Sequence, residues 1–289
     1  MKKIFRVQFL ILAVLVSTTL LSYSQDKFGG LTLYTLQKDM GKNAEETLKE
    51  VAAAGYKYIE SAGYRDGKFY KMTPEEYKNA LEELGMVPLS AHMGGVNLEN
   101  ADQQIADVKA AGIKYFVLPV PPRDFFAFDQ ENRSIKMKGD IKELTEFMNT
   151  LGLKCKEAGL ELLYHNHDFE YKEDENGIVP IEYFMENTDP ELVNFQIDLY
   201  WVVKAGADPI EYMEKYPGRY KIWHVKDMDD QGRFAPVGTG TIDFAKILEK
   251  KDVSGMEYYI VEQDRTFDDM TPQEAIKISH QGLKKFGFN

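Results

Sequence analysis

From residue 28 onward, short apolar runs typical of strands alternate with stretches that repeat apolar residues at helical spacing. Several of the helical stretches stop at a glycine that feeds directly into the next apolar run, which is a common way for a helix to end. The pattern predicts strands at residues 30–36, 56–61, 86–92, 114–120, 160–167, 193–198, 219–226 and 256–262. It predicts helices at residues 43–55, 73–85, 99–112, 140–159, 180–187, 209–216, 241–251 and 271–286.

Strands that are separated by helices must pair in parallel, because each return crosses over the sheet. Eight such strand–helix units favour a (β/α)8 TIM barrel, an α/β fold. No Gly-rich GxGxxG turn follows the first strand, so a dinucleotide-binding sheet gains no support. We see no linker or internal boundary and expect a single barrel domain over residues 25–289. The long connections 121–138 and 168–178 follow strands and are expected to be loops on the catalytic face.

The N-terminus has the composition of a signal peptide. Three cationic residues, Lys2, Lys3 and Arg6, precede an apolar stretch from Phe9 to Leu21, and small residues follow up to Ser24. We predict a signal peptide at residues 1–24, cut after Ser24, and a periplasmic or secreted protein without a membrane anchor after cleavage. The alternative is an uncleaved anchor, although the apolar run is shorter than the ~20 residues that a spanning helix needs.

The net charge restricts the partners. The formal charge is −12, and loss of the three N-terminal cations takes the mature chain to −15. So acidic a surface repels phosphate backbones and argues against nucleic acid as a partner. The one cysteine, Cys155, rules out an internal disulfide, and we expect it to be a buried helix residue.

Polar side chains stand where the predicted strands end. Four of the five histidines occupy such positions, together with three carboxylates. The residues are Glu60, His92, His165, His167, Asp198, His224 and Glu262. In a barrel these ends meet at one mouth, so residues far apart in sequence converge. Mixed imidazole and carboxylate donors suit a divalent metal such as Mn, Co, Zn or Fe.

Each position also has a structural interpretation. A lone histidine at a strand end is commonly a hydrogen-bonding residue, and Asp198 could simply cap the next helix. In the triplet His165-Asn166-His167, alternation places both imidazoles on one side of the strand, and an inward orientation avoids burying them against apolar helices. Lys226 shares a face with His224 and could hold a substrate oxygen or be a solvated strand end. The fifth histidine, His280, is expected on the surface of the last helix.

Together these segments resemble the xylose-isomerase-like barrel superfamily, in particular its sugar phosphate isomerase/epimerase group. The resemblance rests on YIES, SAH, LLYHNHDFEY, FQIDLYW, WHVKD with VGTGTIDF, and YIVEQD, spread over residues 28–289. It implies a divalent metal held by Glu, Asp, His and Glu from strands five to eight. Asp198, His224 and Glu262 match, whereas strand five offers His-Asn-His. We assign His167 as the fourth ligand and His165 to the substrate.

The resemblance implies a metal-dependent isomerase or epimerase that removes a proton beside a metal-polarised carbonyl of a small carbohydrate. Glu262 or His165 is the expected base and Lys226 an oxygen-binding residue. The expected substrate-binding residues are Glu60, His92 and Trp201. The YHNH segment is also similar to inosose dehydratases, so the alternative is a lyase that acts on 3-keto glycosides or inososes. A second alternative is a non-catalytic carbohydrate-binding barrel.

Overall fold

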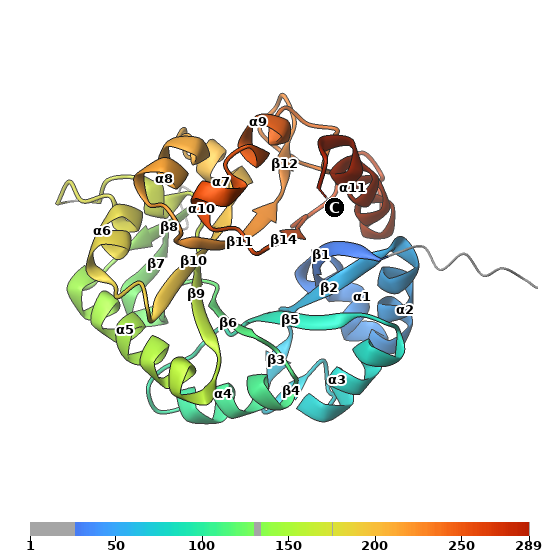
Figure 1. The fold of residues 1–289 in the computed structure, drawn as a ribbon, viewed down its shortest axis with the longest axis horizontal. Coiled ribbons are helices and arrows are strands. Elements are labelled where there is room, and N and C mark those ends of the chain that lie inside the picture. The colour runs from blue at the N-terminus through green and yellow to red at the C-terminus, as the bar shows by residue number, and fades with distance from the viewer. Residues whose placement is uncertain (1–26, 130–133, 175, 289) are drawn as a thin grey trace, which may run out of the picture.

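The computed structural model describes residues 27–129, 134–174 and 176–288, and eight of its strands close into a parallel barrel (Figure 1). Each barrel strand pairs with its neighbours in chain order, and β1 pairs with β14 to close the ring. The predicted (β/α)8 barrel is thus confirmed, whereas the predicted signal peptide at residues 1–24 lies outside the described residues. The barrel strands are β1 (Phe28–Thr32), β2 (Tyr56–Ser61), β5 (Val87–His92), β6 (Tyr115–Leu118), β9 (Glu161–His165), β10 (Val193–Asp198), β11 (Tyr220–Val225) and β14 (Tyr258–Val261).

Helices surround the barrel and follow its strands in sequence (Figure 1). Their ends have the expected chemistry: Thr73 and Glu76 form a reciprocal capping box before α3, and Gly55 and Gly159 end α2 and α5 with left-handed backbone. The helices are α1 (Gln37–Lys42), α2 (Ala44–Ala54), α3 (Pro74–Glu83), α4 (Ala101–Ala110), α5 (Ile141–Ala158), α6 (Pro180–Asn187), α7 (Leu199–Lys204), α8 (Pro209–Lys215), α9 (Phe244–Leu248), α10 (Lys251–Ser254) and α11 (Pro272–Phe286). In the part of the chain that the structure describes, no helix is long and apolar enough to cross a membrane.

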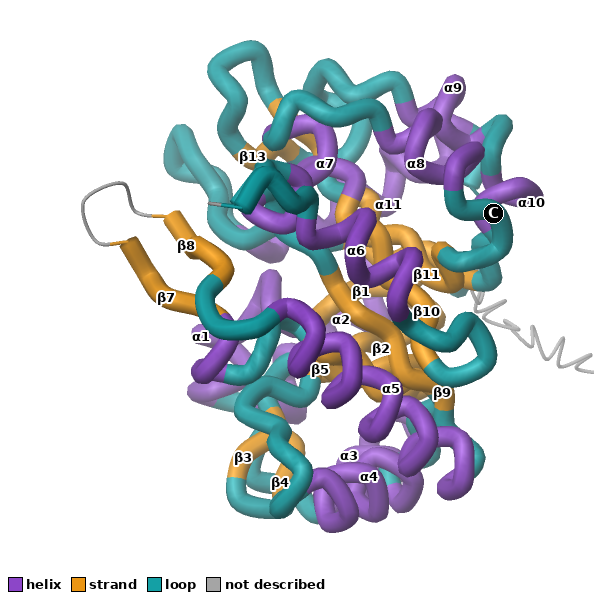
Figure 2. Tube along the Cα trace, turned by 90° about the vertical axis from the view of Figure 1, so that its left-hand side faces the viewer, coloured by secondary structure: helices purple, strands orange, loops and turns teal. Residues whose placement is uncertain are grey.

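The structure differs from the predicted elements in several places. The first strand stops at Thr32, whose side chain accepts the Tyr34 N–H and starts a 3₁₀ helix, η1 (Leu33–Leu36). The connection 121–138, expected as a loop, holds η2 (Arg123–Phe125) and a hairpin that stands away from the barrel (Figure 2). The predicted helix 241–251 divides into α9 and α10. The short hairpins are β3 (Tyr64–Arg65) with β4 (Lys68–Phe69), β7 (Phe126–Asp129) with β8 (Ser134–Met137), and β12 (Asp227–Met228) with β13 (Phe234–Ala235).

Among the described residues, buried apolar side chains form two clusters. The larger one joins the outer face of the barrel to the helices and includes the buried Cys155, which confirms its predicted place. The smaller one has members on five of the barrel strands and includes Leu163, Ile222 and Ile260. Strand side chains alternate between faces, so residues two positions further along these strands also point inward.

The expectation that His280 lies on the surface is wrong. The inner face of α11 carries it against the barrel, where its ring is 3% exposed and lies 4.2 Å from the Phe28 ring and 4.9 Å from the Tyr56 ring. Burial lowers the pKa of His280, so the neutral imidazole packs as an aromatic ring.

Close packing of α11 makes Gly282 sensitive to substitution. A Cβ atom there would lie 1.9 Å from the Val237 carbonyl oxygen, so the loop before α9 would have to move. Gly282→Ala is therefore expected to lower the free energy of unfolding by about 1–3 kcal/mol, as overpacking does, although alanine favours helix. Urea denaturation measures this. The control is Gly41→Ala in α1, where a Cβ has nothing within 4 Å and no loss is expected. Equal changes in the free energy of unfolding for Gly282→Ala and Gly41→Ala would contradict the close contact between Gly282 and Val237.

Candidate metal centre

Inward-facing positions at the carboxyl ends of the barrel strands bring polar side chains together above the inner apolar cluster. The successive inward pairs are Leu163 and His165 on β9, Ile222 and His224 on β11, and Ile260 and Glu262 at the end of β14. Four buried residues each place one possible ligand atom within 4.8 Å of the others: His165, Asp198, His224 and Glu262. We refer to these residues as the four-donor group. His92 lies beside them, since its ring stacks 5.5 Å from that of His224.

Local structure positions Asp198 by two sets of contacts. Asp198 ends β10 and caps α7, with Oδ1 accepting the Trp201 N–H at 3.1 Å. The Asn166 side chain accepts the Asp198 N–H at 3.0 Å and so joins the ends of β9 and β10. The second carboxylate oxygen, Oδ2, is buried and lies 2.9 Å from the Lys226 ammonium. The N-cap expected as an alternative role is thus present, and it leaves one oxygen directed at the four-donor group.

The tautomer of His165 follows from its hydrogen bonds to Gln196. The Gln196 amide nitrogen donates to Glu60 Oε2 at 2.6 Å, which orients the amide oxygen toward the imidazoles. That oxygen lies 3.0 Å from His165 Nδ1 and 2.8 Å from His92 Nε2, and a carbonyl oxygen can only accept. His165 therefore carries its proton on Nδ1 and leaves the Nε2 lone pair for a ligand. Burial also lowers the pKa of His165 well below its usual range, so the imidazole is neutral, as metal binding requires.

Glu60 is a supporting residue that contacts His92 and His224. Its fully buried carboxylate accepts the Ser90 hydroxyl at 2.8 Å, and its Oε1 lies 2.9 Å from His224 Nε2 and 3.0 Å from His92 Nε2. The other nitrogen of His224, Nδ1, is 3.0 Å from Glu262 Oε2. Burial lowers the pKa of His224, but the two flanking carboxylates outweigh burial and raise it to about 10. A positive charge is therefore favoured between His224 and Glu262, from a proton or from a metal ion.

Lys226 is buried among carboxylates. Its Nζ lies 2.7 Å from Glu262 Oε2, 2.9 Å from Asp198 Oδ2 and 3.1 Å from Asp264 Oδ1. Burial opposes ionisation of Glu262, yet Lys226 and His224 lower its pKa well below the usual range. For Asp198 burial prevails and raises the pKa to about 7. The half-buried ring of Trp201 lies 5.3 Å from the lysine ammonium and 5.5 Å from the ring of His167.

The structure separates the two histidines of the YHNH segment by depth. Both are on the same side, as alternation predicts, with ring centroids 5.0 Å apart. His165 is the last β9 residue paired with β10 and belongs to the four-donor group, whereas His167 lies beyond the strand and outside that group. We expected His167 as the ligand and His165 on the substrate, so the geometry favours the reverse assignment. The His167 Nδ1 atom is buried and lacks a partner within the described ranges, and burial lowers the His167 pKa to about 4.

The four-donor group and its surroundings fit a divalent metal. Three carboxylates, those of Asp198, Glu262 and Asp264, lie within 3.1 Å of the Lys226 ammonium, and a fourth, Glu60, lies 2.9 Å from His224 Nε2. Carboxylates therefore outnumber the two cationic side chains, Lys226 and His224. His165 presents a free lone pair, and Asp198 presents a buried oxygen, Oδ2, whose close neighbour is the Lys226 ammonium. The hydrogen bond from the second nitrogen of His165 to Gln196 is the kind of contact that orients metal-binding histidines.

Three contributors were missed in the sequence. Gln196 and Asp264 each lie two residues from a predicted ligand, so alternation along the strand and its extension could have identified them. Glu170 offers no such indication, because its role depends on a turn. Its buried carboxylate accepts the Tyr164 O–H at 2.7 Å and the His167 N–H at 2.8 Å, which fixes the backbone of the YHNH segment.

Glu170 should make stability depend on pH. Burial raises its pKa from 4.5 to about 8, despite the two hydrogen bonds that it accepts. Between these values the folded state holds a proton that the unfolded state has lost, so stability falls as pH rises, by about 1.4 kcal/mol per unit from this residue. Glu170→Gln cannot titrate and is expected to flatten that slope between pH 5 and 8 in urea unfolding. Glu99→Gln, at an exposed glutamate, is the control. A slope unchanged in Glu170→Gln would show that its carboxyl does not bind that proton.

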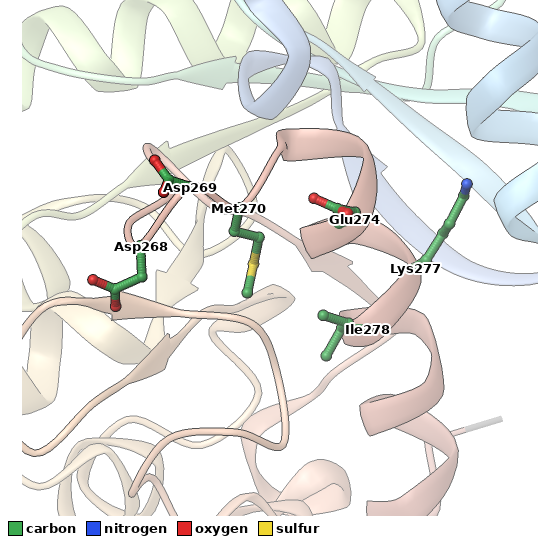
Figure 3. Close-up of a pocket in the computed structure, with 6 residues that line it drawn as sticks. All are labelled: Asp268, Asp269, Met270, Glu274, Lys277 and Ile278. Carbon is green, nitrogen blue, oxygen red and sulfur yellow. The ribbon is translucent and has the colours of Figure 1, made fainter.

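A different pocket, of about 440 Å³, lies over the start of α11 (Figure 3). The acidic side chains of Asp268 and Asp269 come from the loop after β14, and Lys277 and Ile278 extend from the helix. None of its lining residues belongs to the four-donor group. The chemistry of the barrel mouth is therefore separate from this surface.

Comparison with known proteins identifies the family. The sequence profile of the xylose isomerase-like TIM barrel matches residues 48–286, most of the chain. The chain belongs to this family, as the resemblance in its motifs implied.

Relatives within the family have more than one activity. An inosose dehydratase of Clostridium perfringens (strain 13 / Type A) is 27% identical over 266 residues, covering 78% of this chain and 85% of that protein. A crystal structure of a sugar phosphate isomerase/epimerase from Parabacteroides distasonis ATCC 8503 has a TM-score of 0.77 and 29% identity, covering 92% of this chain and 96% of that one. The IOLI protein, solved with a binding zinc atom, has a TM-score of 0.64, covers 89% of this chain and 96% of its own, and at 16% identity shares the fold alone. The chain is thus a member of a family of sugar-modifying enzymes.

Proposed function

We propose that this protein is a metal-dependent enzyme that removes a proton beside the carbonyl of a keto sugar or inosose, and that elimination of water or of another β-substituent follows. The observation that carries the proposal is the composition of the four-donor group: two imidazoles and two carboxylates, buried at the barrel mouth. A divalent cation held by these residues would polarise the substrate carbonyl. Mn, Co, Zn or Fe suits such donors.

Glu262 is the proposed base. Lys226 and His224 keep its carboxylate ionised, and it lies at the end of β14, at the mouth of the barrel. Lys226 would hold the oxygen that becomes negative as the proton leaves, because its ammonium is fixed by three carboxylates. His92, His167 and Trp201 are proposed to position the sugar, and Glu60 orients His92 and His224.

A lyase needs only one acid–base group in this arrangement. The proton that Glu262 takes from carbon can return to the departing β-oxygen on the same face, which yields a hydroxyl product and a carbon–carbon double bond. An epimerase of the pattern that the motifs resemble uses two metal-bound glutamates as paired bases, and here His165 replaces the first of them. The similarity to inosose dehydratases also favours a lyase over an epimerase.

Isomerisation or epimerisation is the second candidate, and the relationship to the Parabacteroides distasonis structure favours it. In that reaction the proton returns to carbon and no substituent is lost. A non-catalytic carbohydrate-binding barrel is the remaining candidate.

One experiment distinguishes the lyase, the isomerase or epimerase, and the non-catalytic binding protein. The purified protein is analysed for metal and then incubated in D₂O with a 3-keto glycoside, an inosose and free ketoses. We expect a stoichiometric divalent ion and release of the β-substituent. Deuterium in recovered sugar without elimination would instead establish an isomerase or epimerase. Absence of both metal and exchange, with sugar binding intact, would establish a binding protein.

We also propose that the protein is exported, on the composition of residues 1–24. Mass spectrometry of protein recovered from the periplasm or medium is expected to find Gln25 as the first residue. Intact Met1 on the recovered protein would contradict cleavage.

A further inference from the structure

A second cavity opens on the catalytic face, between β8 and the segment that links β9 to α6. Its volume is about 490 Å³, within the range of small-molecule sites. Its apolar lining consists of Ile135 and Met137 from β8, Phe169 from the turn after β9, and Pro180 at the start of α6. Ile135 and Met137 are half-buried and offer apolar surface for one face of a sugar ring, while the buried Phe169 and Pro180 form the floor of the cavity.

Phe169 links this cavity to the candidate metal centre. It lines the cavity, and its ring stacks on that of His167 with the centroids 6.0 Å apart and the planes at 20°. The His167 ring in turn lies 5.0 Å from that of His165 in the four-donor group. A molecule that spans from the centre past His167 would therefore reach the cavity.

The charged lining of the cavity is balanced. Two lysines, Lys136 and Lys172, and two acidic residues, Glu173 and Asp174, line it. Lys172 pairs with Asp168, and Asp174 Oδ1 accepts the N–H groups of the turn that follows it. A lining of this kind offers hydrogen-bond donors and acceptors but no net positive charge, so it favours sugar hydroxyl groups over phosphate.

We infer that this cavity is the subsite for a second, uncharged sugar ring, joined by a glycosidic bond to the ring that reacts at the four-donor group. The inference rests on the proposed function and narrows its substrates to glycosides rather than free monosaccharides. The reacting ring lies at the barrel mouth against His167, and the linked ring lies over Ile135 and Met137 between β8 and α6.

Calorimetric titration tests the subsite with defined probes: methyl α- and β-glucoside as single rings, and maltose, cellobiose and trehalose as double rings. At least one disaccharide is expected to bind tenfold or more tightly than either methyl glucoside. Ile135→Trp fills the cavity and is expected to lower disaccharide affinity to that of the methyl glucosides. The affinity for methyl glucosides should change less than twofold. Glu173→Ala, a mild surface change, is expected to reduce the ratio of disaccharide affinity to methyl glucoside affinity at least threefold. Leu153→Trp, on the exposed face of α5, is the matched control and should retain it.

The subsite is overturned if no disaccharide binds more tightly than the methyl glucosides, or if both cavity variants keep the full advantage. The proposed function fails separately, when the wild-type protein neither exchanges nor eliminates with any keto sugar in D₂O. A protein that exchanges single-ring keto sugars but gains nothing from a second ring therefore loses the subsite and keeps the function.

Discussion

Asp198→Asn is expected to abolish metal binding and catalysis while leaving the fold intact. Asparagine retains the oxygen that caps α7 through the Trp201 N–H, so the helix start is preserved. It replaces the charged Oδ2, the buried oxygen that lies 2.9 Å from the Lys226 ammonium, by a neutral amide. Loss of a second-shell partner commonly costs 10–100-fold in affinity or activity, so loss of a direct ligand should cost at least about 100-fold in metal affinity. Turnover should fall at least about 1,000-fold.

Metal content after dialysis and proton exchange in D₂O measure these two losses. The matched control is Asp208→Asn, because Asp208 caps α8 in the same way through the Ile210 N–H but is exposed and outside the site. The control should retain both metal and activity. If Asp198→Asn binds metal as tightly as wild type, Asp198 is only a helix cap, and the four-donor group loses a ligand.

Lys226→Met is expected to destabilise the metal-free protein by about 3–5 kcal/mol, because it leaves buried carboxylates without their counter-charge. Three carboxylate oxygens lie within 3.1 Å of the ammonium that is removed. Methionine keeps most of the volume of the side chain, so the loss reports charge rather than a cavity. Without the lysine, the folded-state pKa of each of these acids rises: the raised values of Asp198 and Asp264 rise further, and Glu262 loses the largest influence that lowers its pKa. The loss should therefore grow as pH rises and shrink at low pH.

Urea unfolding of the metal-free protein at pH 5 and pH 8 measures the effect. Lys114→Met is the control, since Lys114 also pairs with two glutamates, Glu161 and Glu257, but is 41% exposed at the amino end of β6. An exposed pair contributes at most about 1 kcal/mol. A divalent cation that binds Asp198 and Glu262 should recover part of the stability lost in Lys226→Met and none of that lost in Lys114→Met. Equal losses in both variants would mean that Lys226 does not neutralise the site.

The fold was predictable because its determinants are local. Alternating faces, capping residues such as Thr73 and stopping glycines such as Gly55 and Gly159 act within a few residues of each other. The hairpins β3–β4, β7–β8 and β12–β13 were missed, because their strands are too short to show a period. The surface placement of His280 was wrong because the face of α11 that packs on the barrel depends on helix orientation, which the spacing around a single histidine does not reveal.

The sequence by itself determined which side chains reach the barrel mouth. His165, Asp198, His224 and Glu262 end apolar strands, and parallel strands in a closed barrel bring their carboxyl ends together. Only the tertiary structure decided which imidazole joins the other donors. His165 and His167 share a face, so alternation treats them alike, whereas β9 stops pairing at His165 and Gln196 on the neighbouring strand orients that ring. The depth of each imidazole in the barrel and the tautomer of His165 depend on contacts between neighbouring strands. Such contacts exist only once the barrel has closed.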